Sequence, residues 1–566
     1  MTPDAFRREL QAALGLLNAG RGAEARARLT PLIEAHPAQP DAHALMGLAL
    51  EQLGDLEGGA AELRQAISLN PRQPQYRLQL GHLLLAKDTK AAEDAFQSAA
   101  EVAPRALEPL QGLARAQKAQ GRQDEAVATH RRIAAAAPAN AAVRHNLAAA
   151  LNDAGEAEDA EATARAVLSS GADGPETWLV LGRALEAQGR YDEAEAAYGQ
   201  ALRRRPDFLD AHTDLSELIW MRTGDVGLAL AQLGGQAGPG RPLLDIQRAR
   251  ILDYAGDGPA ALALLRESLA RNGETPVLLT AAANTAGSLD PALAMDLARR
   301  AEALAPHDRG VMTSLCLAQL AAGEAAAAAA TAERLAEGDP DDQFALALLA
   351  TAWRLLDDIR HGELNDYALV RTYELVAPPG WSNLSAYLAD LAQALESLHD
   401  LSAHPIGQSL RHGSQTRRDL KRAQAPAIKA FFEALNPALQ EHAAWLGQGL
   451  DPVRRRNTGR FRLAGAWSVR LRPQGFHASH VHPRGWLSSA FYVDLPASVT
   501  DGEGREGWIQ FGEPGCPARP LLAAEHQVRP EPGLLVLFPS YMWHGTVPFS
   551  GDRHRLSIAF DVVPEA

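Results

Sequence analysis

The sequence has very few cysteines, no long apolar run and no excess of basic residues. Its two cysteines, Cys316 and Cys516, stand 200 positions apart in a chain of 566 residues. This spacing excludes a disulfide framework and a thiolate metal cluster but leaves a single bridge open. The chain has no stretch of about 18 uninterrupted apolar residues, the length that a membrane span needs. Its start, MTPDAFRREL, lacks a basic segment followed by an apolar one. We therefore expect a cytoplasmic protein with no membrane span.

The deficit of positive charge is confined to the first part of the chain. The formal net charge is −14, and residues 1–350 hold 33 Lys+Arg against 47 Asp+Glu, whereas residues 351–566 hold 22 of each. An acidic surface repels a phosphate backbone, so this part argues against nucleic-acid binding. The surplus acid either keeps a large helical array soluble, which we favour, or lines a groove for a basic ligand.

Prolines recur in the first part of the chain with a period of about 34 residues. The recurring positions are Pro37, Pro71, Pro104, Pro138 and Pro206, and the period resumes at Pro306 and Pro340. The clearest unit is ETWLVLGRALEAQGRYDEAEAAYGQALRRRP, residues 176–206. This unit resembles the tetratricopeptide repeat, a pair of antiparallel helices that stacks on its neighbours.

The residue types in this unit suit close helix packing. Small residues such as Gly182 and Ala194 would let the two helices approach each other. Leu181 and Tyr198 would fill the gap beside them, and Pro206 would end the second helix. We predict an α-solenoid of about nine or ten such hairpins over residues 1–350, with a poor match in residues 207–300. Its concave face would take either an extended peptide or a second copy of the chain, so a protein partner and a homodimer both stay open.

The composition changes near residue 350, and we expect two further domains beyond it. Seven of the nine tryptophans lie in residues 351–566. Residues 382–401 and 427–446 have the pattern of amphipathic helices, with the loop HPIGQSLRHGSQT between them, and we interpret residues 351–450 as a helical connector. Residues 451–566 contain the short β-runs AWSVRL, SSAFYVDL, WIQF, LLVLFP and LSIAFDVV, separated by Gly and Pro. This pattern predicts a jelly roll, and thus a multidomain α + β chain.

Histidines stand out in the predicted β-domain. In the stretch FHASHVHPRG, His480 and His482 are two positions apart, so an extended segment would present both on one face, about 7 Å apart. His544 follows 62 residues after His482. Alternation also places Arg555 and Ser557 on one face of the last strand.

Two neighbouring residues compete with this set. His477 is an odd number of positions from His480, so we interpret it as a polar loop residue outside the site. Arg553 is the rival of Arg555, but it falls in the turn-like segment GDRH that precedes the last strand.

The C-terminal part resembles the iron(II)- and 2-oxoglutarate-dependent oxygenases, and most closely the bacterial family of these enzymes that follows tetratricopeptide repeats. The matching stretches are QSLRHGSQT, HVHPRGWLSSAFYVDLP, PGLLVLFPSYMWHGTVPF and RLSIAFD. The resemblance implies a double-stranded β-helix with O2 as a substrate. It also implies an Fe(II) site at His480, His482 and His544. Arg555 would anchor 2-oxoglutarate, with Ser557 and Tyr492 beside it.

One ligand position departs from the superfamily pattern. The usual carboxylate is replaced by His482, so the site would consist of three neutral imidazoles, a set that zinc enzymes also use. The metal therefore stays open between iron and zinc, and His482 is either a ligand or leaves the third position open. The loop QSLRHGSQT would bring Gln408, Arg411 and Thr416 over the site or would only cap a helix. Trp486 is interpreted as core or pocket wall.

Three functions follow from these patterns. The first is an Fe(II)- and 2-oxoglutarate-dependent oxygenase that hydroxylates a protein or peptide presented by the repeat array. The second is a three-histidine zinc enzyme on the same β-fold, and the third is a repeat scaffold without catalysis. Arg555 favours the first function over the second, because its planar cationic fork suits a carboxylate.

Overall fold

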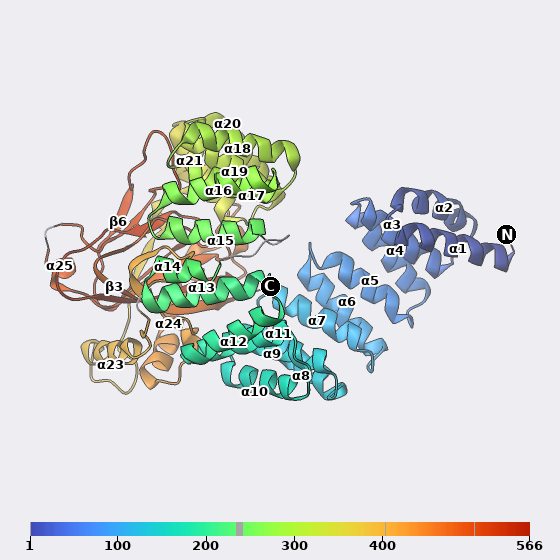
Figure 1. Cartoon of the computed structure of the whole chain (residues 1–566), viewed down its shortest axis with the longest axis horizontal. Coiled ribbons are helices and arrows are strands. Elements are labelled where there is room, and N and C mark those ends of the chain that lie inside the picture. Colours follow the sequence, from blue (N-terminus) through green and yellow to red (C-terminus); the bar gives the residue numbers. More distant parts are fainter. Residues whose placement is uncertain (1, 234–240, 402, 503, 566) are drawn as a thin grey trace. The chain divides into compact units, whose positions relative to one another are not determined.

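The computed structural model describes residues 2–233, 241–401, 403–502 and 504–565 (Figure 1). The chain divides into two compact units, Met1–Gln188 and Gly189–Ala566. Among the described residues, no helix combines the length and the apolar character that crossing a membrane requires.

The first unit is entirely helical in its described part. Its helices are α1 (Pro3–Asn18), α2 (Gly22–Ala35), α3 (Pro40–Gln52), α4 (Leu56–Leu69), α5 (Pro74–Leu84), α6 (Thr89–Val102), α7 (Leu107–Ala119), α8 (Gln123–Ala136), α9 (Ala141–Asp153), α10 (Ala157–Ser169) and α11 (Pro175–Ala187). The periodic prolines Pro37 and Pro71 each stand two residues after a helix, α2 and α4, as predicted. Small residues permit close packing: a methyl group on Gly81 would lie 2.6 Å from the Phe96 ring.

The second unit begins with further helices of the same kind. They are α12 (Tyr191–Arg204), α13 (Leu209–Thr223), α14 (Val226–Ala231), α15 (Arg241–Tyr254), α16 (Gly258–Asn272), α17 (Pro276–Ala286), α18 (Pro291–Leu304), α19 (Arg309–Ala322), α20 (Ala325–Gly338) and α21 (Gln343–Leu355). Helices therefore also form in the described parts of residues 207–300, which are 207–233 and 241–300, despite their poor match to the repeat pattern.

The segment predicted as a helical connector contains strands as well as helices. Its elements are α22 (His361–Leu364), η1 (Tyr367–Leu369), β1 (Arg371–Glu374), α23 (Leu384–Glu396), β2 (Leu410–Gln415), η2 (Leu420–Arg422) and α24 (Pro426–Leu446). The helices α23 and α24 are those expected. The strands β1 and β2 were not expected, because β1 is only four residues long and β2 lies in the polar loop QSLRHGSQT.

The remaining elements complete two antiparallel sheets. They are η3 (Arg454–Arg456), β3 (Phe461–His477), β4 (Leu487–Asp494), α25 (Ala497–Thr500), β5 (Ile509–Phe511), β6 (His526–Val528), β7 (Leu534–Pro539), β8 (His544–Thr546) and β9 (Arg555–Pro564). A six-stranded sheet has the order β1-β7-β4-β9-β3-β2, and a three-stranded sheet has the order β6-β5-β8. Both are antiparallel throughout, and the two-sheet arrangement is compatible with the predicted jelly roll.

One hydrophobic core joins the sheets to the last helices of the array. It includes Leu320 of α19, Trp353 of α21 and Phe431 of α24, together with Phe491 and Phe560 of the large sheet. Helix α21 therefore packs as part of the β-domain core as well as part of the helical array, and no exposed linker separates the two at residue 350.

Candidate metal centre

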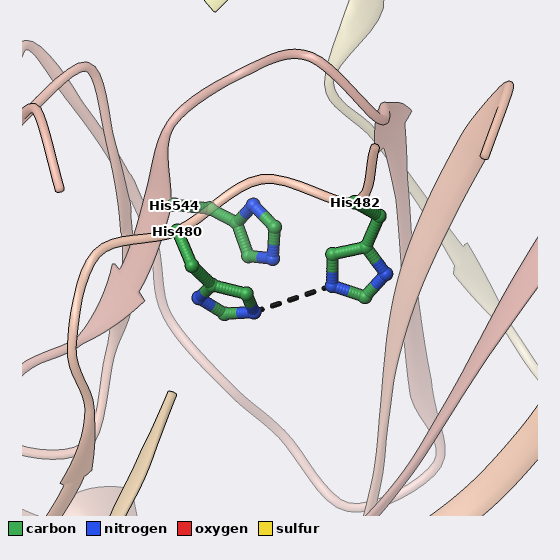
Figure 2. Close-up of side chains that lie close together, drawn as sticks. All are labelled: His480, His482 and His544. Carbon is green, nitrogen blue, oxygen red and sulfur yellow. Dashed lines mark hydrogen bonds between the residues drawn. The ribbon is translucent and has the colours of Figure 1, made fainter. Parts of the chain in front are cut away.

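The three predicted histidines lie together on two adjacent backbone segments (Figure 2). His480 and His544 face each other in an antiparallel bridge: the His480 amide donates to the His544 carbonyl at 2.9 Å, and the His544 amide donates to the His480 carbonyl at 3.0 Å. The His482 amide donates to the Ser540 carbonyl at 3.0 Å, just before β8. Backbone pairing thus fixes the segment HVH against the strand that carries His544.

The hydrogen bonds of the three rings fix their orientation. Nδ1 of His480 lies 3.0 Å from the Ala478 carbonyl, and Nδ1 of His544 lies 3.0 Å from the Met542 carbonyl. A carbonyl oxygen only accepts, so these two Nδ1 atoms carry the proton and the lone pair of each ring is on its Nε2 atom. Nδ1 of His482 donates to Asp561 Oδ1 at 2.6 Å, which has the same consequence for its Nε2.

The Nε2 atoms of His480 and His482 lie only 3.2 Å apart, and a dashed line joins them in Figure 2. All three rings offer a nitrogen atom within 4.8 Å of the others. Burial lowers the pKa of His480 to about 3 and that of His544 well below its usual range, so both rings are neutral at neutral pH. Neutral imidazoles with converging lone pairs repel each other, unless a cation lies between them, and they are the form that binds metal ions. The donor set therefore fits a divalent metal.

Arg555 lies in the same cavity with part of its guanidinium unpaired. Arg555 is 2% exposed, and its Nη1 donates to Ser557 Oγ at 3.4 Å. Within the described part of the chain, Arg555 Nε and the Tyr492 hydroxyl are buried without a hydrogen-bond partner. The Arg555 guanidinium carbon lies 5.0 Å from the centre of the Tyr492 ring. A buried cation with an unpaired Nε beside a phenol suits a carboxylate ligand.

Arg553, the rival of Arg555, has a different environment. Its Nη2 lies 2.5 Å from Asp494 Oδ2, and its side chain is 60% exposed. It does not line the cavity that contains the histidines.

The site opens into a cavity of about 650 Å³. The three histidines, Arg555 and Ser557 line it, as do Gln408 and Arg411 of the loop QSLRHGSQT, which agrees with the first of the two alternatives for this loop. Tyr254, the last residue of α15, lines it too. The Arg411 guanidinium lies 4.7 Å from the centre of the Tyr254 ring and donates to the carbonyl groups of Gln408 and Leu410.

Two predicted pocket residues lie elsewhere. Thr416 is buried and accepts a hydrogen bond from the Ser468 amide at 2.9 Å, so it ties β2 to β3 and does not line the cavity. Trp486 is a core residue whose Nε1 donates to the Val453 carbonyl at 2.8 Å.

His477 was wrongly assigned to a polar loop. It is the last residue of β3, opposite Leu410 of β2, and it lines the cavity. Ser409 Oγ lies 2.9 Å from its Nδ1 and 3.2 Å from Nε2 of His480. Strand alternation counted back from His480 fails here because the chain leaves β3 between the two histidines.

Asp561 was missed altogether. It stands on β9 and lines the cavity, and its Oδ1 accepts hydrogen bonds from His482 Nδ1 at 2.6 Å and from Ser488 Oγ at 2.8 Å. The signal was present in the sequence, because positions 555, 557 and 561 have the same parity on one strand.

Comparisons with known families agree with this organisation. Residues 465–561, which span all three histidines, Arg555 and Asp561, match the family described as "Putative 2OG-Fe(II) oxygenase". The chain carries a domain of this oxygenase family. Residues 10–75, 45–108 and 179–242 match the tetratricopeptide repeat family, so the oxygenase-family domain follows a helical array that contains tetratricopeptide repeats. No curated protein matches the chain.

Solved structures with similarity to the chain include repeat proteins. PilF of Pseudomonas aeruginosa is 19% identical, with 38% of this chain and 98% of that chain covered and a TM-score of 0.32. A tetratricopeptide repeat protein of Parabacteroides merdae is 15% identical, with 44% and 98% covered and a TM-score of 0.35. The thermophilic repeat protein TTC0263 of Thermus thermophilus is 22% identical, with 32% and 100% covered and a TM-score of 0.26.

Proposed function

We propose that this chain is an Fe(II)- and 2-oxoglutarate-dependent oxygenase that hydroxylates a protein or peptide held by the helical array. The observation that carries the proposal is one cavity containing three converging Nε2 atoms and a buried arginine with an unpaired Nε. His480, His482 and His544 would hold the metal through Nε2. Fe(II) with 2-oxoglutarate would supply oxygen activation, in which the keto acid is decarboxylated to succinate.

The chain's own residues would bind and orient the co-substrate. Arg555 would receive the distal carboxylate of 2-oxoglutarate, with Ser557 and the Tyr492 hydroxyl as further donors. These groups are already desolvated, so the ligand would satisfy polar atoms that otherwise stay unpaired in the core. A zinc hydrolase would need the three histidines and a water molecule but would leave the Arg555 Nε and Tyr492 hydroxyl unused. This difference favours the oxygenase over the zinc enzyme.

The wall of the cavity supports a substrate delivered by the helical array. Tyr254 belongs to α15, a helix of the array, and it lines the same cavity as the histidines. Arg411, which also lines the cavity, lies over its ring and offers a cation there. A peptide lying along the array near α15 would therefore reach the metal past an aromatic ring and a guanidinium group.

Metal reconstitution without oxygen tests the reaction. Adding Fe(II) and 2-oxoglutarate to metal-free protein should give a weak visible charge-transfer band, and admitting oxygen should produce succinate. Protein loaded with Zn(II) is the control and should produce none. Fe(II)-loaded protein that neither binds nor consumes 2-oxoglutarate would overturn the proposal. Activity must decide between the metals, since Zn(II) binds such sites more tightly than Fe(II) and purified protein can carry it for that reason alone.

The substrate is tested separately with a proteome-derived peptide mixture and mass spectrometry. The active protein should add the mass of one oxygen atom to particular peptides. Tyr254→Ala should reduce this product while leaving 2-oxoglutarate affinity unchanged, and Tyr254→Phe, which keeps the ring, should behave as the unaltered protein. Equal product from Tyr254→Ala would remove α15 from the substrate path.

A further inference from the structure

The position of His482 is where the oxygenase superfamily places a carboxylate ligand, and a carboxylate lies directly behind it. His482 Nδ1 donates to Asp561 Oδ1 at 2.6 Å. The other two rings donate from Nδ1 to backbone carbonyl groups, those of Ala478 and Met542, which carry no net charge. Among the three histidines, His482 alone is backed by a carboxylate in the described structure.

Asp561 is itself held in place. Ser488 Oγ donates to its Oδ1 at 2.8 Å, and Ser488 Oγ lies 2.8 Å from Ser540 Oγ. Ser488 and Ser540 are both fully buried. The Asp561 side chain is 19% exposed and that of His482 is 13% exposed. The carboxylate is therefore fixed in direction, and little water is present to screen its charge.

A carboxylate that accepts from Nδ1 of a metal-binding histidine fixes the ring and makes its Nε2 a stronger donor. A hydrogen bond to an ionised carboxylate is stronger than one between neutral groups. The negative charge of Asp561 lies one imidazole ring away from the point where the three Nε2 atoms converge. The three-histidine set alone would leave the full charge of a divalent metal uncompensated.

We propose that Asp561 is a positioning residue that supplies, through the ring of His482, the negative charge that a carboxylate ligand supplies elsewhere in the superfamily. The inference rests on the proposed function only in requiring that the three histidines bind a divalent metal. It implies that residues 482 and 561 form one functional pair, in which one member is a carboxylate and the other is not.

The pair makes a prediction that neither residue makes alone. In His482→Asp, the introduced carboxylate oxygen is as many bonds from Cβ as Nδ1 is, so it can lie where Nδ1 lies, 2.6 Å from Asp561 Oδ1 in the unaltered protein. Two ionised carboxylates at such a distance repel each other. His482→Asp should therefore fail to restore the superfamily site, although it recreates the usual ligand. Adding Asp561→Asn replaces the repulsion with an amide that can donate to the new carboxylate.

The test measures metal affinity in four proteins: unaltered, Asp561→Asn, His482→Asp and the double variant. Co(II) is titrated without oxygen by absorption spectroscopy, and Fe(II) is titrated against a chelator. Asp561→Asn should weaken binding about 10- to 100-fold in the unaltered background. In the His482→Asp background the same substitution should strengthen binding. Ser488→Ala, which removes the hydrogen bond to Asp561 together with the contact to Ser540, should weaken binding by less than Asp561→Asn does.

Asp494→Asn is the matched control. Asp494 ends β4 and pairs with Arg553 away from the cavity, so its substitution should leave metal affinity unchanged. Thermal unfolding of each metal-free variant identifies any general loss of folding. If Asp561 only stabilised the fold, Asp561→Asn would change metal affinity in the same direction in the unaltered background and in the His482→Asp background.

The outcomes separate this inference from the proposed function. Unchanged affinity in Asp561→Asn, or weakening in both backgrounds, overturns the role of Asp561 even if the protein is an active oxygenase. If Asp561→Asn weakens Co(II) binding in the unaltered background and strengthens it in the His482→Asp background, the role of Asp561 is supported even if 2-oxoglutarate fails to bind. Failure to bind 2-oxoglutarate overturns only the proposed function. An unaltered protein that binds neither Co(II) nor Fe(II) overturns both.

Discussion

Replacing Arg555 by alanine removes the buried cation proposed to hold 2-oxoglutarate, without touching the metal ligands. Each hydrogen bond to a charged group contributes about 1.5–3 kcal/mol. Arg555 has a fork suited to two such bonds, and its Nε is unpaired in the cavity. The cavity is open to solvent at its mouth, so we take the lower part of that range for the pair, about 3–4 kcal/mol. At about 1.4 kcal/mol for each tenfold change, Arg555→Ala should weaken 2-oxoglutarate binding about 10²–10³-fold.

The assay follows the charge-transfer band of Fe(II)-loaded protein during anaerobic titration with 2-oxoglutarate. Iron affinity is measured separately and should stay within about threefold of the unaltered value, because Arg555 donates to Ser557 and is proposed to bind the acid and not the metal. Arg553→Ala is the matched control and should give the unaltered titration curve, since Arg553 pairs with Asp494 at the surface. Superimposable curves for Arg555→Ala and the unaltered protein would refute the reasoning and reopen the choice of carboxylate anchor.

Further predictions concern the metal, the pH dependence and the packing of the site. His544→Ala should abolish the charge-transfer band, and His482→Ala should severely weaken Fe(II) binding; unchanged binding in the latter would leave the third position open. Burial lowers the pKa of His442 in the folded protein to about 4. On acidification the unfolded chain therefore binds a proton at this histidine before the folded protein does, and the free energy of unfolding decreases as the pH falls below about 6.5. Between pH 7 and 5 this decrease is about 2 kcal/mol, and His442→Gln should make the acid-induced decrease in the free energy of unfolding smaller by that amount. The same decrease in the variant and in the unaltered protein would show that His442 does not cause it. Thr351→Val should lower the free energy of unfolding by about 1 kcal/mol in denaturant titration, because Thr351 Oγ1 accepts from Trp543 Nε1 at 2.9 Å; an unchanged midpoint would show that this bond contributes nothing.

The sequence was sufficient to predict the cluster of three histidines, because two of its members are related by a local spacing. His480 and His482 follow the two-residue period of an extended segment, and Arg555 and Ser557 follow the same period on β9. The helical array was predictable for a similar reason, since the period of its prolines does not depend on distant contacts. Whether the histidines bind iron stays a prediction.

The errors arose where distant contacts decide the structure. His477 enters the cavity because β2 pairs with β3, and the sequence gives no register for a strand as polar as LRHGSQ. Within that strand His412 adopts a positive φ of 54°, which interrupts any simple alternation. Trp486 was ambiguous because an indole suits both a core and a pocket wall, and only its bond to Val453 decides between them.

The packing of α21 against the β-domain affects where this protein can be cut. Trp543, the residue before His544, donates from Nε1 to the Ala347 carbonyl and to Thr351 Oγ1 of α21. Arg354 of the same helix donates to the carbonyl of Gly512. A fragment that starts at residue 451 would keep all three histidines and Arg555 but would lose these partners and two strands of the large sheet. The smallest fragment that keeps the site intact, whether in an engineered fusion or after a gene rearrangement, therefore includes the final helices of the array. A truncation series should start upstream of these helices.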